Sequence, residues 1–232
     1  MFISRMPLNV ERAQAMRLIS SPYRIHAAVE HAFAPGANRL SPDGRILWRI
    51  DASTHDKDVI WLYVVSPDRP DFSHLCEQVG WPTTTQWECK DYSPVISSIQ
   101  EGQVWQFRLK ANPSRRVARD CGLRSNASVV GKTMGHVTVG QQVDWLAARA
   151  ARNGFEVLQG ESGAPRVNVS HRKIERFARG SEMVTLSTAR FDGLLRVTDG
   201  DAFKQALCHG LGRAKGFGCG LMTIAPVRRS AG

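Results

Sequence analysis

The stretch DAFKQALCHGLGRAKGFGCGLMTIAPV, residues 201–227, contains three elements whose order decides the fold class. Its first part predicts a helix over 201–209, and its last part predicts a strand over 221–227. Five glycines lie between them, together with Arg213 and Lys215. A dinucleotide-binding turn of the Rossmann type runs from strand through loop to helix, so the reverse order found here argues against that fold.

The glycines allow the backbone between this helix and strand to adopt positive φ values and to approach another molecule closely. Bare N–H groups beside an arginine and a lysine are typical of phosphate binding. A glycine-capped helix followed by a tight turn is the alternative, but it needs only two of the five glycines. We therefore expect the segment to bind phosphate or nucleic acid through Gly212, Arg213, Lys215, Gly216 and Gly218.

Working outward, the same order of elements is found twice along the chain. The first set is predicted as a strand over 2–8, a helix over 22–33, strands over 45–50 and 59–66, a helix over 72–79 and a strand over 84–90. The second set is predicted as a strand over 104–110, a helix over 141–153, strands over 155–158, 167–174 and 183–197, and then the stretch quoted above. Each set approximates β-α-β-β-α-β, the ferredoxin-like or RRM-like unit. We expect an α+β protein of two tandem ferredoxin-like domains, 1–91 and 103–232, joined by a linker over 92–102.

The charged residues are also distributed unevenly between the first and the second part of the chain. Residues 1–100 hold 10 basic and 11 acidic side chains, whereas residues 101–232 hold 21 basic and 10 acidic ones. The whole excess of +10 therefore comes from the second part. Such asymmetry indicates a polyanionic partner, although a basic surface that only aids solubility is the alternative. Of the 31 cations, 24 are arginine, which suits bidentate contacts with phosphate and guanine.

Basic residues gather on three further segments. One begins on the predicted strand over 104–110 and ends in a basic turn, and two lie on a predicted hairpin arm. A hairpin that carries arginines can grip a nucleic-acid backbone, whereas an edge strand with solvated charges is the alternative. The RNA-binding candidates on these segments are Arg108, Lys110, Arg115, Arg116, Arg172, Lys173, Arg176 and Arg179.

One histidine stands out as a catalytic candidate. Tyr23 and His26 are three residues apart on the predicted helix over 22–33 and therefore share a face. RNA cleaves itself without metal when one group removes the 2′-hydroxyl proton and another protonates the departing 5′ oxygen, and histidine can serve either step at neutral pH. A half-buried structural histidine is the alternative. Metal-dependent hydrolysis is disfavoured because the sequence has no HExxH motif and no spaced carboxylate cluster.

The cysteines and the apolar runs of the sequence indicate the cellular compartment. Five cysteines form no C-x-x-C pair, and their odd number and wide spacing favour reduced thiols in the cytoplasm. No apolar run approaches the roughly 18 residues of a membrane span, and residues 1–10 do not resemble a signal peptide. We expect a cytoplasmic protein with no metal, no cofactor and no contact with a membrane.

Segments spread over nearly the whole chain resemble one family. They are Tyr23 and His26 after a first strand, FRLKANP at 107–113, FDGLL at 191–195, GLGRAKG at 210–216, GCGLM at 218–222 and Ala225-Pro226. Together they resemble the CasE (also Cse3) family, the CRISPR RNA-processing endoribonucleases of type I-E Cascade systems.

The resemblance implies two tandem ferredoxin-like domains that bind the hairpin of the CRISPR repeat in precursor RNA. It implies metal-independent cleavage at the 3′ base of the hairpin, with 2′,3′-cyclic phosphate and 5′-hydroxyl ends, by a protein that stays bound as a Cascade subunit. The family's catalytic residues map to His26 and Tyr23. Ala27 stands where some relatives have a basic residue, which leaves Lys173 and Lys215 as candidates for a third catalytic group. A non-catalytic RNA-binding module of a ribonucleoprotein is the alternative function.

Overall fold

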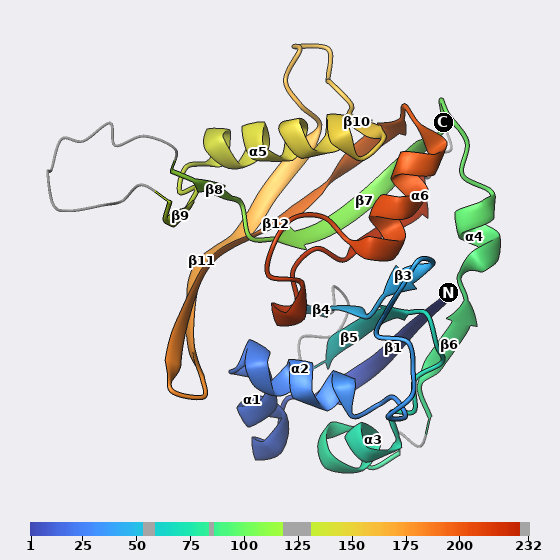
Figure 1. Ribbon diagram of the computed structural model, residues 1–232, viewed down its shortest axis with the longest axis vertical. Coiled ribbons are helices and arrows are strands. Elements are labelled where there is room, and N and C mark those ends of the chain that lie inside the picture. Colours follow the sequence, from blue (N-terminus) through green and yellow to red (C-terminus); the bar gives the residue numbers. More distant parts are fainter. Residues whose placement is uncertain (53–58, 84–85, 118–130, 228–232) are drawn as a thin grey trace, which may run out of the picture.

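The computed structural model describes residues 1–52, 59–83, 86–117 and 131–227. It contains two antiparallel sheets, each covered by helices on one face (Figure 1). Among the described residues, no helix combines the length and the hydropathy that crossing a bilayer would require.

The first sheet is built from β1 (Phe2–Asn9), β4 (Leu47–Ala52), β5 (Val59–Ser66) and β6 (Glu88–Asp91). Their order is β4-β5-β1-β6, so the first strand lies in the middle between the third and the fourth, as a ferredoxin-like unit requires. Alternate residues of β1 point into the core, where Met6 and Leu8 are fully buried. The helices α2 (Pro22–Glu30) and α3 (Ser73–Val79) pack on this face, as does a helix that was not predicted, α1 (Ala13–Ile19).

The second sheet has the same topology. Its strands are β7 (Val104–Ala111), β10 (Phe155–Val157), β11 (Val167–Arg179), β12 (Glu182–Val197) and β13 (Met222–Pro226), in the order β10-β12-β7-β13 with β11 also paired to β12. The helices α5 (Val139–Arg152) and α6 (Gly200–His209) cover one face, and Thr138 and Gln141 form a capping box at the start of α5. The fold class of two tandem ferredoxin-like units is confirmed.

Shorter elements lie within the two units and between them. A small hairpin joins β2 (Leu40–Ser41) to β3 (Gly44–Arg45), and α4 (Ser93–Ser97) lies between the last strand of the first sheet and β7. A second hairpin pairs β8 (Ser114–Arg116) with β9 (Thr133–Gly135), and the 3₁₀ helix η1 (Lys215–Phe217) interrupts the glycine segment, residues 210–220. The domain bounds 1–91 and 103–232 stay a prediction.

The two units meet around Arg49 of β4, whose side chain is buried. Its guanidinium pairs with Asp51 on the same strand and donates hydrogen bonds to the carbonyl oxygens of Arg108 and Leu221, at 2.9 and 3.0 Å. It also donates to the hydroxyl of Thr223, at 2.8 Å. Because Arg108, Leu221 and Thr223 all belong to the second unit, this one side chain fixes the first sheet against β7 and β13.

Candidate active site

Helix α2 carries the two candidate catalytic residues, Tyr23 and His26, at the edge of the hydrophobic core of the first domain. Pro22 begins the helix, and Ile25 and Val29 face the sheet and are buried. Tyr23 is 41% exposed, and the side chain of His26 is 35% exposed. The helix therefore places both groups where they can reach solvent and a bound molecule.

His26 lies against the second domain. A Cβ atom added to Gly216 of η1 would stand 3.4 Å from His26 Nε2, so the imidazole packs against the backbone of the glycine segment. His26 Nδ1 is buried without a hydrogen-bond partner, 3.9 Å from Oε1 of Glu30. Since Nδ1 is enclosed, Nε2 is the ring nitrogen that can face a substrate.

The surroundings of His26 favour its neutral form. Burial lowers the pKa of His26 below the ordinary value of 6.5, and the positive charges of Arg45 and Arg179 lower it further, while Glu30 raises it. A neutral imidazole at physiological pH can accept a proton, which the first step of metal-independent RNA cleavage requires.

Most glycines of the glycine segment have a packing reason to be glycine. Gly210, Gly212, Gly218 and Gly220 all have φ between 74 and 92°. A Cβ atom at Gly212 would meet the ring of Trp145 at 3.0 Å, and one at Gly218 would meet the ring of Trp48 at 2.5 Å. Gly216 differs, because its φ lies outside the left-handed region and a Cβ atom there would make ordinary van der Waals contact.

This difference predicts opposite results for two alanine variants. Gly218→Ala is expected to destabilise the protein by about 2–5 kcal/mol, because it adds left-handed strain to overlap with the buried ring of Trp48. Gly216→Ala is expected to change the free energy of unfolding by less than about 1 kcal/mol. Urea denaturation checks both, and equal midpoints for the two variants would contradict the assignment.

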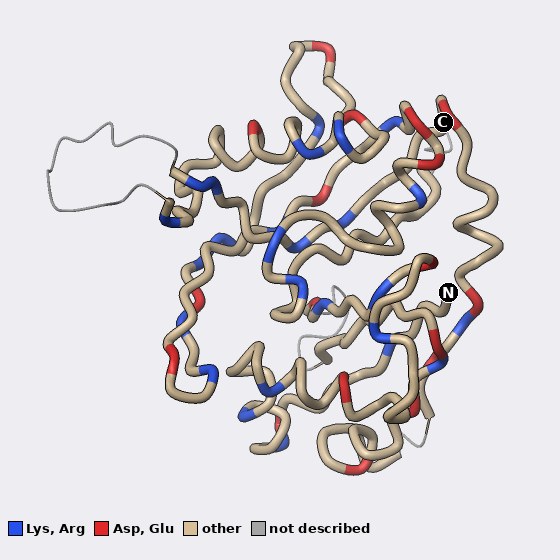
Figure 2. Tube along the Cα trace, in the orientation of Figure 1, with Lys and Arg blue, Asp and Glu red and all other residues tan. Residues whose placement is uncertain are grey.

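The long hairpin of β11 and β12 reaches from the second domain to α2 (Figure 1). Near its tip, the rings of Phe177 and Phe217 pack edge to face with centroids 5.0 Å apart, which ties the hairpin to η1. Arg176 and Arg179 are exposed on the same strand, and the charge of Arg179 reaches His26. Lys and Arg residues occur along both the hairpin and the loop before η1 (Figure 2).

Some of the predicted RNA-binding cations already have protein partners. Lys110 and Lys173 both contact Oε1 of Glu175, at 3.0 and 3.3 Å. Burial raises the pKa of Glu175, but the two lysines outweigh it and the net direction is downward. Arg108 pairs with Asp192, and Arg172 donates to the carbonyl oxygen of Val137. Part of the positive charge is therefore already paired with groups of the second domain itself.

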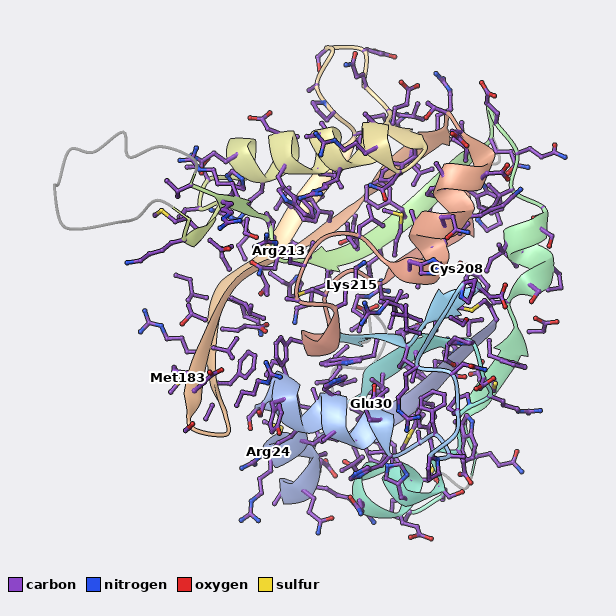
Figure 3. The ribbon with its side chains drawn as sticks, in the orientation of Figure 1. Arg24, Glu30, Met183, Cys208, Arg213 and Lys215 are labelled. Atoms are coloured by element: carbon purple, nitrogen blue, oxygen red, sulfur yellow. The ribbon has the colours of Figure 1, made fainter. Side chains whose placement is uncertain are left out.

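Lys215 has a different environment. It is half-buried on η1, next to the glycine that packs on His26, and burial followed by the charge of Arg45 lowers its pKa. Figure 3 labels Lys215 on the part of the loop nearer α2, and Arg213 on the side of α5. Of the two candidate lysines, Lys215 is therefore the one that directly precedes the glycine packed on the imidazole.

A basic pocket adjoins the glycine segment. Its volume is about 500 Å³, and five arginines line it: Arg115, Arg116, Arg149, Arg152 and Arg213. Arg213 also donates to the hydroxyl of Thr133 at 2.7 Å. Arg149 and Arg152 were not predicted, although their spacing of three residues on α5 could have indicated a shared face.

Histidine, cysteine, aspartate and glutamate are the residue types that commonly bind metal ions. In the part of the chain that the structure describes, no three His, Cys, Asp or Glu side chains gather as metal ligands would. Cys76, Cys89, Cys208 and Cys219 are free thiols, and Cys121 lies outside the described residues.

Comparison with known proteins places this geometry in a family. A family model described as CRISPR associated protein matches residues 1–226. The chain belongs to this family. The CRISPR-associated endoribonuclease Cse3 of Thermus thermophilus is 29% identical over 237 aligned positions, which cover 97% of this chain and 100% of the relative. The CRISPR system Cascade subunit CasE of Escherichia coli is 27% identical over 133 positions, 56% of this chain and 61% of the relative.

Solved structures of CRISPR-associated proteins share the fold. The endoribonuclease Cse3 bound to a 19-nucleotide RNA superimposes with a TM-score of 0.80 at 27% identity, covering 97% of this chain and 100% of the other. Thermus thermophilus Cse3 bound to an RNA that represents a pre-cleavage complex has a TM-score of 0.76 at 27% identity and covers 97% and 98% of the two chains. These findings bear out the predicted CasE/Cse3 membership.

Proposed function

We propose that this protein is an endoribonuclease that binds the hairpin of a CRISPR repeat in precursor RNA and cleaves it at its 3′ base without a metal ion. The observation that carries the proposal is the position of His26, an imidazole whose pKa is lowered by burial and which lies where the glycine segment of the second domain meets α2. The names and RNA complexes of the Cse3 relatives support it.

The proposed reaction uses the RNA as its own nucleophile. The 2′ oxygen attacks the adjacent phosphorus, and its proton passes to the neutral imidazole of His26. The bond from phosphorus to the 5′ oxygen breaks as that oxygen takes a proton from solvent, to which the imidazolium of His26 then returns its own. The products carry a 2′,3′-cyclic phosphate and a 5′-hydroxyl. Tyr23 orients the reacting group from the same helix face, and Lys215 supplies positive charge at the site.

The stem of the hairpin would lie on the basic surfaces around this site. The arginines of the basic pocket and Arg176 and Arg179 of the long hairpin offer charge-assisted contacts to phosphate. A stem that contacts several such groups releases many counterions, which favours retention of the cleaved product. We infer that the protein stays on its product in the cytoplasm as a subunit of a Cascade assembly, as the name of the CasE relative supports.

One experiment tests the proposal. The purified protein is incubated in EDTA with a hairpin RNA taken from the CRISPR repeat that neighbours its gene. We expect a single cut at the 3′ base of the stem and a product whose 3′ end can be extended only after the cyclic phosphate is removed. Binding without any cut would instead support a non-catalytic RNA-binding module, and a cut that needs Mg²⁺ would contradict the metal-independent mechanism.

A further inference from the structure

Arg45 is brought to the catalytic histidine by the fold of the first domain. It is the last residue of β3 and pairs with Leu40 across the small hairpin. Its neighbour Gly44 packs against the carbonyl oxygen of Cys208 near the end of α6, from which the glycine segment starts. Trp48, three residues later, lies under Gly218. Arg45 is therefore anchored where the glycine segment leaves α6 and returns across the first domain.

The side chain of Arg45 has unused hydrogen-bonding capacity. Its Nε is buried without a partner, and within the described ranges of the chain Arg45 forms no ion pair. Buried polar groups in folded proteins nearly always have a partner, so the unpaired Nε of Arg45 calls for an explanation, and a role in catalysis is one.

The charge of Arg45 reaches two groups of the candidate site. It lowers the pKa of His26 on α2 and the pKa of Lys215 on η1. The elements that carry these residues also meet, because η1 packs on α2 through Gly216 and His26, and β3 packs on the end of α6, from which the glycine segment leaves. Two cations beside an imidazole form an environment suited to a phosphodiester.

We propose that Arg45 is a catalytic residue that donates N–H groups to a non-bridging oxygen of the scissile phosphate and stabilises the negative charge of the pentacoordinate transition state. The proposal rests on the function proposed above. A guanidinium suits this role because it stays protonated throughout the pH range of the enzyme and presents its donors in a planar fork. Donors fixed in advance toward developing charge act mainly on the transition state, so Arg45 affects the rate more than binding.

The test compares Arg45→Gln and Arg45→Lys with a control, Arg196→Gln. Arg196 is 50% exposed near the end of β12 and is paired only with Glu156 among the described residues. In single-turnover cleavage of the repeat hairpin, Arg45→Gln is expected to be about 10²–10³-fold slower, with a dissociation constant raised less than about tenfold. Arg45→Lys is expected to regain about tenfold of the lost rate, because the charge returns without the fork. The control is expected to cleave at the wild-type rate.

Two readouts separate catalysis from a structural role. A single sulfur in place of one non-bridging oxygen of the scissile phosphate is expected to slow the wild type, and Arg45→Gln is expected to lose most of that sensitivity. The charged groups that face His26 are Glu30 on α2, Arg45 on β3 and Arg179 on β11. Removing Arg45 raises the pKa of His26, so the acidic limb of the rate profile is expected to move to higher pH.

The outcomes distinguish this inference from the proposed function. Wild-type protein that does not cleave the hairpin contradicts the function itself. An Arg45→Gln variant that cleaves at the wild-type rate, while His26→Ala is inactive, overturns only the role of Arg45. If Arg45→Gln melts early, Arg45→Lys decides: a folded lysine variant with unchanged sulfur sensitivity and unchanged rate refutes the contact.

Discussion

The His26→Ala variant is expected to cleave the repeat hairpin about 10³-fold more slowly than the wild type, with a dissociation constant within about twofold. His26 is the proposed proton acceptor for the 2′-hydroxyl, and its contribution is made in the transition state rather than in the bound complex. The variant removes a side chain that is 35% exposed, so the fold should survive. Single-turnover cleavage and filter binding of the same RNA measure the two quantities separately.

The pH dependence of the wild-type cleavage rate also follows from the pKa of His26. Burial lowers the pKa of His26 below 6.5, and the neutral form is the active one. The rate should therefore decline toward acidic pH, with a midpoint below that of an ordinary histidine. Added imidazole should restore part of the rate of His26→Ala, whereas a substrate with 2′-deoxyribose at the cut should stay intact with either protein. A wild-type rate for His26→Ala would remove this residue from the mechanism.

The tandem fold could be predicted because most of its elements carry local signals. Thr138 and Gln141 begin α5, Pro22 begins α2, and the glycine at 210 ends α6, each by a recognised capping or terminal preference. Helix α2 ends at Glu30, three residues before the predicted end, although Phe33 beyond it is buried. The chain leaves the helix there while still packing on the core, which the spacing of apolar residues could not show.

Elements that depend on tertiary contact were missed. Helix α1 has neither a side-chain hydrogen bond at its N-cap nor an acidic residue in its first turn, so little in the local sequence marks its start. The small hairpin of β2 and β3 has only two residues in each strand, too few for a periodic pattern. This omission mattered for the site, because Arg45, predicted as the first residue of the strand over 45–50, lies on β3 instead.

Some residues of the candidate site could likewise be predicted from the sequence, and others could not. Tyr23 and His26 could be found because one helix carries both at a spacing of three. Arg45 could not be found, because only the tertiary fold of the first domain brings β3 toward α2. Conversely, Lys110 and Lys173 look like free cations in the sequence, and only the sheet register that places Glu175 beside them shows that they are paired. Charge runs predict where cations are, but they do not predict which ones the fold neutralises.

The largest expected decrease in stability comes from Arg49→Leu, which should lower the free energy of unfolding by about 3–5 kcal/mol. The side chain is 1% exposed, and its removal leaves the buried carboxylate of Asp51 with the more distant Arg108, 3.7 Å away, as its ion-pair partner among the described residues. It also removes the donors that hold the carbonyl oxygens of Arg108 and Leu221 in the second domain. Urea denaturation should show the lower midpoint, and the two sheets should unfold in less cooperative steps because Arg49 no longer joins them.

Arg5 offers a matched control in the same sheet. Its pair with Glu88 is short, 2.6 Å, but the two side chains are 42% and 49% exposed. Arg5→Leu should therefore cost roughly 1 kcal/mol or less, because water screens the pair and solvates the carboxylate that remains. Adding Asp51→Leu to Arg49→Leu should recover part of the stability, since no buried charge is then left alone. Equal decreases for Arg5→Leu and Arg49→Leu would show that burial at the domain junction does not set the strength of these interactions.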